Sequence, residues 1–368
     1  MARSKKKNRN YGFGIVGCGM ISEFQGKAIQ AMQGGHLECV YSRSEKNARR
    51  RGKQFGVPWY TDYKKFLLHS GLDIVTVCTP SGAHVDPCVK AAEAKKHVIC
   101  EKPLEVTLAR CDAIINACRK NRVMLGGVFP SRFSGATCRI KEEIDKGRLG
   151  RLTVGDAVIK WYRTQEYYDS GAWRGTWELD GGGALMNQSI HTIDLLQWFM
   201  GPVTHIIAYA DCLIHKRIEV EDAAAAVLRF KNGGIGTITG TTAAFPGLPR
   251  KVQVSGEHGT IFLEDSFITK WEFQKSKPYD KTVRKKYGKK QGGRKAAGAA
   301  DPSAIDFTPH QKQFSNFVNA LNGREKLLVD GKEARKAVEM ILAIYKSAHT
   351  GKTVSLPLKQ PPPRKSFK

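Results

Sequence analysis

The sequence predicts two domains: an α/β domain with a parallel sheet, then an α+β domain with a large, mostly antiparallel, open sheet. Three observations predict this fold class. The chain has 368 residues, more than one typical core holds. Its first third alternates short apolar runs with helical patterns, which is typical of βαβ units. After Pro130, long β-branched runs follow one another without intervening helices.

In the first domain, apolar runs predict strands and the segments between them predict helices. The expected strands span 11–19, 36–44, 72–80, 97–103 and 123–129. The expected helices span 21–33, 45–55, 84–95 and 107–121. Because a helix returns the chain to the same edge after each strand, the strands form one parallel sheet.

The second domain is predicted to begin with one or two helices and to continue as a sheet. Its strand-like runs span 151–163, 203–215, 223–230, 233–245, 251–256 and 260–266. Amphipathic patterns at 309–323 and 331–351, each ended by glycine, predict two closing helices. We therefore expect a basic tail at 1–10, domains at 11–129 and 130–356, and a basic, proline-rich tail at 357–368.

The net charge of +26 is concentrated in three segments. The N-terminal tail carries five positive charges, residues 275–295 carry a net nine, and residues 359–368 carry four. Such runs are more often solvated segments than nucleic-acid sites, and the sequence shows no nucleic-acid-binding module. We therefore expect a loop-like basic insertion at about 275–300. Nucleic-acid association stays an alternative, which a steep salt dependence of binding would reveal.

The cysteine pattern and the hydropathy indicate a cytoplasmic protein. The nine cysteines form no CxxC pair, which indicates reduced thiols and neither a disulfide framework nor a metal site. No apolar stretch reaches the roughly 18 residues of a membrane helix, so no membrane partner is expected. The basic N-terminus precedes a glycine-rich run without a signal-peptide cleavage site.

The stretch "GIVGCGMIS" at 14–22 joins the first strand to the first helix. Gly17 and Gly19 stand where a dinucleotide fingerprint needs a tight turn and a close approach to pyrophosphate, and Met20 and Ile21 open the helix. The third fingerprint position is serine instead of glycine. The strand before and the helix after the motif predict a Rossmann dinucleotide-binding domain.

The second strand ends at Ser42 and Arg43, with no acidic residue at the corner that binds the adenosine ribose. A carboxylate there would accept hydrogen bonds from the ribose of NAD, whereas a hydroxyl and a guanidinium suit the 2′-phosphate of NADP. We therefore expect NAD(P)(H), with NADP(H) favoured. An ordinary surface arginine is the structural alternative.

A lysine is placed where a buried strand ends. In "VICEKP" the apolar run stops at Glu101 and Lys102, and Pro103 restricts the backbone of Lys102. Further along, three glycines lead into a helix on which Asn187 and His191 share a face. A histidine there can titrate near neutral pH and carry a proton, although a core histidine is the more common reading.

These motifs resemble those of the Gfo/Idh/MocA oxidoreductase family, which includes glucose–fructose oxidoreductase and inositol dehydrogenase. The matching stretches are "GIVGCGMIS" (14–22), "VCTPSGAH" (77–84), "CEKP" (100–103) and "GGGALMNQSIHTIDLLQW" (181–198). The resemblance implies that Lys102 is a catalytic lysine beside the nicotinamide and that His191 exchanges a proton with the substrate. It also implies a cofactor-binding role for Thr79, Pro80, His84, Glu101 and Lys102.

Many members of that family carry aspartate where this chain has Asn187, which hydrogen-bonds a sugar hydroxyl but relays no proton at neutral pH. The stretch from Tyr167 to Gln188 is similar to members that oxidise the C3 hydroxyl of nucleotide-linked N-acetylated sugars or uronates. On this likeness, a wall for a sugar ring and an anionic group comprises Arg163, Tyr167, Trp173, Arg174 and Trp177. Plain core packing is the alternative for the aromatic residues.

The resemblance thus implies an NAD(P)-dependent oxidoreductase. It would move hydride between nicotinamide and a ring hydroxyl or ketone, with C3 as a candidate, of a sugar, sugar derivative or polyol. A homo-oligomer, dimer or tetramer, built through the open sheet is implied as well. Two alternatives share the fold: an NAD-dependent glycoside-cleaving enzyme, and a sensor that binds dinucleotide without catalysis.

Overall fold

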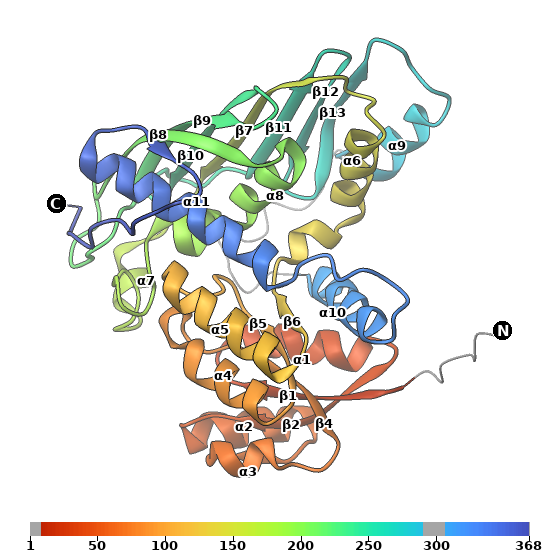
Figure 1. Ribbon diagram of the computed structural model, residues 1–368, viewed down its shortest axis with the longest axis vertical. Helices are drawn as coiled ribbons and strands as arrows, with labels where there is room; N and C mark the ends of the chain where they lie inside the picture. Colours follow the sequence, from red (N-terminus) through yellow and green to blue (C-terminus); the bar gives the residue numbers. More distant parts are fainter. Residues whose placement is uncertain (1–8, 290–305, 368) are drawn as a thin grey trace. The chain divides into compact units, whose positions relative to one another are not determined.

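The computed structural model describes residues 9–289 and 306–367 and confirms the predicted fold class (Figure 1). The described chain divides into two compact units. The first contains the residues up to Pro130 together with Asp306–Arg335, and the second contains the remainder. Among the described residues, none of the helices is both long enough and apolar enough to cross a membrane.

The first unit is built on six parallel strands in the order β3-β2-β1-β4-β5-β6. They are β1 (Tyr11–Val16), β2 (Gly35–Tyr41), β3 (Trp59–Tyr60), β4 (Leu72–Val77), β5 (His97–Cys100) and β6 (Leu125–Gly127). Strand β1 is buried throughout, as expected for a strand covered on both faces. The strand order reverses between β1 and β4, and ligands bind at the carboxyl edge beside such a reversal.

The helices of this unit follow the strands as the βαβ pattern predicts. They are α1 (Ile21–Ala31), α2 (Glu45–Phe55), α3 (Tyr63–Leu67), α4 (Val85–Glu93) and α5 (Leu108–Asn121), with a 3₁₀ turn at Ser81–Ala83. Ser44, Asp62 and Thr107 cap α2, α3 and α5 by accepting a hydrogen bond from a backbone N–H in the first turn. These caps explain where the three helices begin.

Helix α10 (Thr308–Leu321) completes the core of the first unit. The rings of Phe314 and Phe13 lie 6.0 Å apart, and Gln313 Nε2 donates to the Gly127 carbonyl oxygen at 2.6 Å. The expected second domain, 130–356, includes residues 306–335, whereas the structure places Asp306–Arg335 in the first unit. The apolar face of α10 fits the helix-covered sheet of the first unit, and an amphipathic pattern alone does not say which sheet a helix covers.

The second unit is built on eight strands in the order β13-β12-β11-β7-β10-β9-β8-β14. They are β7 (Leu152–Lys160), β8 (Val203–Asp211), β9 (Ala223–Phe230), β10 (Ile235–Thr241), β11 (Lys251–Gly256), β12 (Gly259–Glu264), β13 (Phe267–Phe273) and β14 (Val354–Ser355). Strands β7 and β10 run parallel, and the other described pairs of this sheet are antiparallel.

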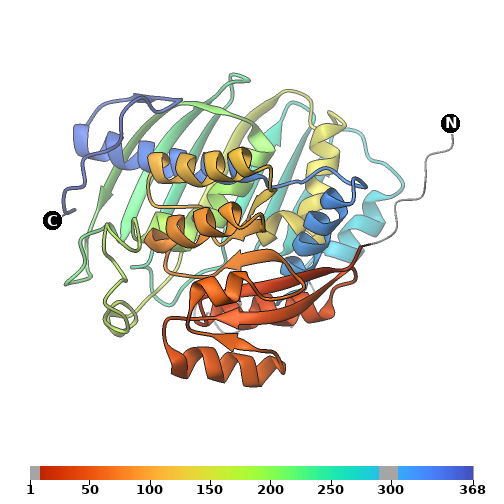
Figure 2. The ribbon, with the colours of Figure 1, turned by 60° about the horizontal axis from the view of Figure 1, so that its bottom comes forward.

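One face of this sheet is covered by helices and the other is open. Helix α8 (Ile190–Met200) packs on β7, and α11 (Gly331–Thr350) crosses the strands, as Figure 2 shows in blue. Strand β9 alternates buried and exposed residues accordingly. On the open face Ile207 is 44%, Tyr209 83% and Val227 52% exposed. The remaining helical segments are α6 (Gly135–Asp145), α7 (Gln165–Asp169), a π-helix (Ala184–Ser189), α9 (Asp280–Tyr287) and a 3₁₀ turn at Pro130–Phe133.

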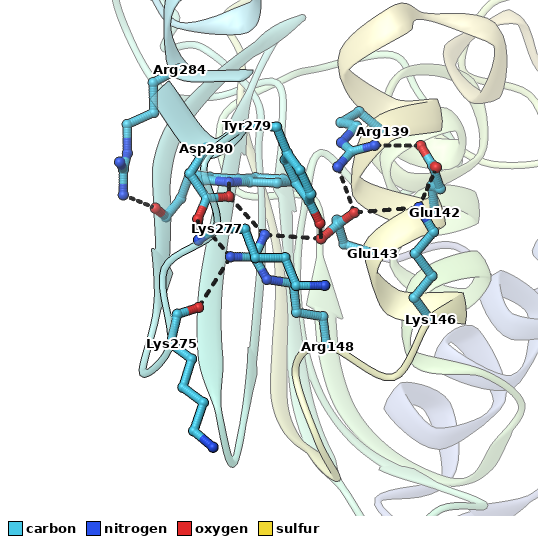
Figure 3. A network of polar contacts seen from close by, with 11 residues as sticks. Arg139, Glu142, Glu143, Lys146, Arg148, Lys275, Lys277, Tyr279, Asp280 and Arg284 are labelled. Atoms are coloured by element: carbon cyan, nitrogen blue, oxygen red, sulfur yellow. Dashed lines mark hydrogen bonds and ion pairs between the residues drawn. The ribbon is translucent and has the colours of Figure 1, made fainter. Parts of the chain in front are cut away.

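The described part of the predicted basic insertion, residues 275–289, contains a helix, α9, and is held by a polar network (Figure 3). Arg148 donates to both carboxylate oxygens of Asp280, at 2.7 and 2.6 Å, and to Glu143 Oε2 at 3.0 Å. Trp271 Nε1 also donates to Asp280, and the hydrogen bond from Arg148 holds the pKa of Asp280 far below its usual range. Residues 275–289 are therefore anchored, and 280–287 are helical where a loop was expected, while 290–300 lie outside the described residues.

The predicted C-terminal tail, as far as residue 367, also packs against the second unit. Phe367 is 6% exposed, stacks on His349 at 4.2 Å between ring centroids, and contacts the rings of Trp177 and Tyr345. Its N–H donates to the Glu219 carbonyl oxygen at 3.3 Å. Trp177, expected in the substrate wall, is therefore a core residue, because its ring is enclosed by this aromatic cluster.

Candidate active site

The glycine loop joins β1 to α1 in the first unit. Gly17 has φ of +94°, in the left-handed region, and a Cβ there would lie 2.8 Å from the backbone of Cys78. A Cβ at Gly19 would meet no heavy atom of the described residues within 4 Å. The fold itself therefore requires Gly17, whereas the space beside Gly19 is open to a ligand.

Side chains hold the carbonyl groups of this loop. Ser22 Oγ donates to the Gly19 carbonyl oxygen at 2.6 Å, and Arg51 Nη2 donates to the same oxygen at 2.8 Å. Arg50 Nη2 donates to the Cys18 carbonyl oxygen at 3.1 Å. The serine at the third fingerprint position thus supplies a hydrogen bond that glycine could not. Sequence reasoning missed both arginines, because a basic helix gives no sign of which side chains turn inward.

The first turn of α1 fits a phosphate. Met20, the N-cap residue, is 52% exposed and gives no side-chain hydrogen bond, and Ile21 opens the helix. The N–H groups of such a helix end, with the partial positive charge of the helix dipole, bind anions. The loop and the helix end together therefore fit the pyrophosphate of a dinucleotide.

Alanine at the two glycines is expected to separate folding from cofactor binding. Gly17→Ala should cost about 1–3 kcal/mol of stability, because the residue keeps a left-handed backbone and meets the next strand. Gly19→Ala should leave the melting temperature nearly unchanged but weaken dinucleotide binding about tenfold or more, because the methyl group occupies the approach of the pyrophosphate. Thermal unfolding and NADH fluorescence titration measure the two effects, and equal melting temperatures for both variants would contradict this division.

Ser42 and Arg43 follow β2 at the expected corner. The Ser42 N–H donates to the Tyr60 carbonyl oxygen at 3.1 Å, and its Oγ accepts from the Ser44 N–H at 3.3 Å, so this serine also shapes the turn. Arg43 is exposed, as are Lys46 and Arg49 on the following helix. The corner therefore presents positive charge to solvent.

The loop after β4 carries Thr79, Pro80 and His84. Thr79 and Pro80 are partly buried, and His84 is fully buried. His84 Nε2 lies 3.0 Å from the Thr79 carbonyl oxygen and Nδ1 lies 3.0 Å from that of Pro103, while burial lowers the pKa of the imidazole. His84 thus ties this loop to the segment that contains Lys102, and a cofactor contact from its ring stays a prediction.

Glu101 and Lys102 follow β5 at the carboxyl edge of the sheet. Gln25 Nε2 donates to Glu101 Oε1 at 2.5 Å, and the Thr76 hydroxyl donates to the Gln25 side-chain oxygen. Glu101 is 6% exposed and burial raises its pKa. Its other oxygen accepts the Lys102 N–H at 3.1 Å, which fixes the backbone from which the partly buried lysine projects.

In the second unit, Glu221 holds the start of the helical segment that carries the candidate histidine. Its carboxylate accepts from the N–H groups of Gly183 and Leu185, at 2.9 and 2.8 Å, and from the Tyr345 hydroxyl at 2.9 Å. Burial raises the pKa of Glu221 to about 7. A Cβ at Gly183 would lie 1.8 Å from the Glu221 carbonyl oxygen, so the glycine run is needed for this close approach.

Asn187 lies within the π-helix and His191 in the first turn of α8. Single π turns inside helices occur frequently at functional sites. Asn187 Nδ2 donates to Asp180 Oδ1 at 2.5 Å, and Asn187 Oδ1 accepts from Gln188 Nε2 at 3.2 Å. His191 is partly buried. Sequence reasoning missed Asp180, although it directly precedes the conspicuous glycine run.

Arg163, Trp173 and Arg174 lie together around Tyr167. Arg174 Nη1 donates to the Tyr167 hydroxyl at 2.5 Å, and its guanidinium lies 4.2 Å from the Tyr167 ring centroid and 4.5 Å from that of Trp173. Arg163 Nη2 donates to Gln188 Oε1 at 3.0 Å. Among the described residues Arg174 has no ion-pair partner. Guanidinium groups on aromatic faces suit a sugar ring that bears an anionic group.

His215 and Asp222 support the backbone of Arg163. His215 Nδ1 lies 2.8 Å from Asp222 Oδ2, and Nε2 lies 2.9 Å from the Arg163 carbonyl oxygen. Both neighbours are acceptors, so only the doubly protonated ring donates to both. Burial opposes this charge, but the two hydrogen bonds outweigh it and raise the pKa of His215. Asp222, hydrogen-bonded by His215 and by three backbone N–H groups, has its pKa lowered to about 2 despite burial.

This pair predicts a pH-dependent stability. A raised folded-state pKa means that the contribution of His215 is complete below the ordinary histidine pKa and is lost as pH rises through the raised value. The contribution of Asp222 is lost only as pH falls through about 2. The free energy of unfolding of wild type should exceed that of His215→Asn by about 1.5–3 kcal/mol in mildly acidic buffer, and by less in alkaline buffer.

Urea unfolding across this pH range measures the difference, and His205→Asn, at an exposed histidine of β8, is the control. A difference between wild type and His215→Asn that does not change with pH would mean that the ring is neutral throughout.

Comparisons with known proteins identify the family of both units. Residues 11–128 match the oxidoreductase family with an NAD-binding Rossmann fold, and residues 137–262 match the GFO/IDH/MocA C-terminal domain. The solved WlbA dehydrogenase from Bordetella pertussis, in complex with NADH and UDP-GlcNAcA, is 32% identical over 95% of this chain and 99% of that chain, with a TM-score of 0.86.

Two further matches are a curated protein and a solved structure. Myo-inositol 2-dehydrogenase from Thermotoga maritima is 28% identical over 68% of this chain and 75% of that protein. The structure of levoglucosan dehydrogenase with NADH and levoglucosan shares the fold, with a TM-score of 0.82 at 20% identity over 95% of this chain and all of that chain (100%).

Proposed function

The chain belongs to the Gfo/Idh/MocA oxidoreductase family and is an NAD-dependent dehydrogenase acting on CH–OH groups of sugars or polyols, and from this premise we propose its substrate class. The substrate is a sugar derivative with an anionic group, oxidised or reduced at a ring hydroxyl or ketone, with C3 as the position. The observation that carries this proposal is the cluster of Arg163, Arg174 and aromatic rings. The WlbA relative, which holds UDP-GlcNAcA, supports it.

Each residue of the site has a proposed role in this reaction. Lys102 and His191 take up the hydroxyl proton when the alcohol is oxidised and return it when the ketone is reduced. When bound, the nicotinamide would supply the acceptor for the hydride that leaves the carbon bearing this hydroxyl. Glu101 holds the backbone of Lys102, and Arg174 pairs with the anionic group of the substrate.

A substrate screen tests the proposal. UDP-GlcNAcA, its neutral counterpart UDP-GlcNAc, myo-inositol and levoglucosan are compared by cofactor reduction with NAD and with NADP. We expect the highest kcat/KM with UDP-GlcNAcA. In Arg174→Met this value should fall about tenfold or more, since a charge-assisted bidentate contact is lost, while any turnover of a neutral sugar changes little. A higher kcat/KM with a neutral polyol than with UDP-GlcNAcA would overturn the proposal.

The choice between NAD and NADP is a separate proposal. The WlbA relative from Bordetella pertussis holds NADH. The exposed Arg43 and the absence of an acidic residue at the corner support a preference of this chain for NADP among the two nicotinamide cofactors. Arg43→Ala should weaken NADP binding about tenfold and leave NAD binding unchanged, because a guanidinium–phosphate contact is lost. Lys53→Ala, the same loss of charge farther along α2, is the control. Equal loss for both cofactors would show that Arg43 contributes only general positive charge.

We also propose a cytoplasmic homo-oligomer assembled through the open face of the eight-stranded sheet. The exposed apolar side chains of Ile207, Tyr209 and Val227 support the interface, since patches of this kind mark association sites. All nine cysteines are free thiols, which supports a reducing compartment. Sedimentation equilibrium tests the assembly and cell fractionation tests the location; a monomer mass at micromolar concentration would count against the interface.

A further inference from the structure

Asn187 is hydrogen-bonded to a buried carboxylate seven positions earlier in the chain. Asp180 is 2% exposed, and its Oδ1 accepts from Asn187 Nδ2 at 2.5 Å. Its Oδ2 accepts the N–H of Gly175 at 2.9 Å, and its own N–H donates to the Thr176 carbonyl oxygen at 3.2 Å. Asp180 is therefore held at both oxygens and at its backbone, and it is placed directly beside Asn187.

This contact fixes which way the amide of Asn187 faces. A carboxylate only accepts hydrogen bonds, so the NH₂ group of Asn187 must point to Asp180. The amide oxygen points the other way and accepts from Gln188 Nε2 at 3.2 Å. Gln188 is itself held, because Nε2 also donates to the Tyr167 hydroxyl at 2.8 Å and Oε1 accepts from Arg163. The orientation of Asn187 is thus linked to the arginine and aromatic cluster.

We propose that Asp180 is a positioning residue for the reaction: it sets the orientation of the Asn187 amide and keeps a negative charge beside an uncharged side chain. The inference rests on the proposed function and deepens it. An amide alone carries no charge, and the carboxylate one hydrogen bond away restores negative potential at this position. The alternative is that Asp180 only closes the turn that begins at Gly175.

A reciprocal exchange separates the two roles. In Asp180→Asn, the new amide oxygen still accepts from Gly175, so the turn keeps its hydrogen bond. The NH₂ group of the new amide, however, faces the NH₂ group of Asn187. Because two donors cannot pair, the Asn187 amide must rotate. We expect kcat with UDP-GlcNAcA to fall roughly 10–100-fold, as for a misplaced group in a reacting site, with cofactor KM and melting temperature unchanged.

Asn187→Asp places two carboxylates side by side, where they share a proton, so the pH–kcat profile should gain an ionisation absent from wild type. The double variant Asp180→Asn/Asn187→Asp exchanges amide and carboxylate and remakes the hydrogen bond. It should recover kcat to within about fivefold of wild type, because coupled sites are not additive. Asp169→Asn, an exposed carboxylate of α7, is the matched control and should not change kcat.

Every result decides between the two roles. Asp180→Asn with wild-type kcat and pH profile, or a double variant no better than the worse single variant, would overturn the positioning role. If either of these results is obtained while the wild-type protein turns over UDP-GlcNAcA, only the positioning role is overturned and the proposed function still holds. A wild-type protein that neither binds nor oxidises UDP-GlcNAcA overturns the proposed substrate class and, with it, this inference.

Discussion

Lys102→Ala is expected to lower kcat by about 10²–10⁴-fold, the range for loss of a group that transfers protons in the transition state. Lys102 follows Glu101 at the carboxyl edge of the parallel sheet, with its N–H bonded to the Glu101 carboxylate. The proposed pyrophosphate site is the glycine loop and the first turn of α1, so we expect dinucleotide affinity to stay within about threefold of wild type. Steady-state kinetics and fluorescence titration measure the two quantities.

The control for this experiment is Lys90→Ala, an exposed lysine of α4 paired with Asp86. It removes the same charge from the same unit and should leave kcat unchanged. A Lys102→Ala protein with more than about a third of wild-type kcat would show that the lysine carries no proton in the slow step. In that case His191→Ala should be examined next, since the imidazole would be the remaining candidate.

Asp194→Ala should strongly destabilise the second unit. Arg132 Nε and Nη2 donate to the two oxygens of Asp194 at 2.8 and 2.6 Å, and both side chains are almost fully buried. The guanidinium also lies 5.2 Å from the Trp198 ring centroid. Removing the carboxylate leaves a buried positive charge, which costs about 3–5 kcal/mol. The melting temperature should fall by roughly 10 °C.

Differential scanning calorimetry measures this loss. Asp169→Ala is the matched control, because Asp169 pairs with Arg217 at the surface, where both side chains are exposed. It should leave the melting temperature unchanged, since exposed pairs contribute little. If the two variants melted at the same temperature, the Arg132–Asp194 pair would be no more important than a surface contact.

The fold class and the order of elements were predictable because they depend on local patterns. Alternating apolar and amphipathic segments predict the βαβ units of the first domain. The fingerprint around Gly17 predicts the edge of the sheet at which a dinucleotide binds. The seventh strand of the second sheet, β13, was missed because "FITKWEF" mixes charged and apolar residues with little alternation. The helix α9 was missed because its stability comes from Arg148, more than 120 residues earlier.

The hydrogen-bond partners of the site residues could not be predicted, because they are distant from those residues in the sequence. Gln25 and Glu101, or Gly183 and Glu221, lie far apart in the sequence and meet only through the tertiary fold. A buried glutamate also has no local signature, since charged residues are usually exposed. Asn187 was recognised as a departure from the family, but the carboxylate beside it appears only in the structure.

Helix α10 has a consequence for how the protein is made. The nucleotide-binding core lacks Phe314 and its neighbours until the ribosome has synthesised the chain past Leu321, long after β6 has emerged. A nascent chain that stops at residue 130 exposes the apolar surface that α10 covers, and protease should cut it readily. The amino-terminal half is thus first to be translated and cannot be first to finish folding.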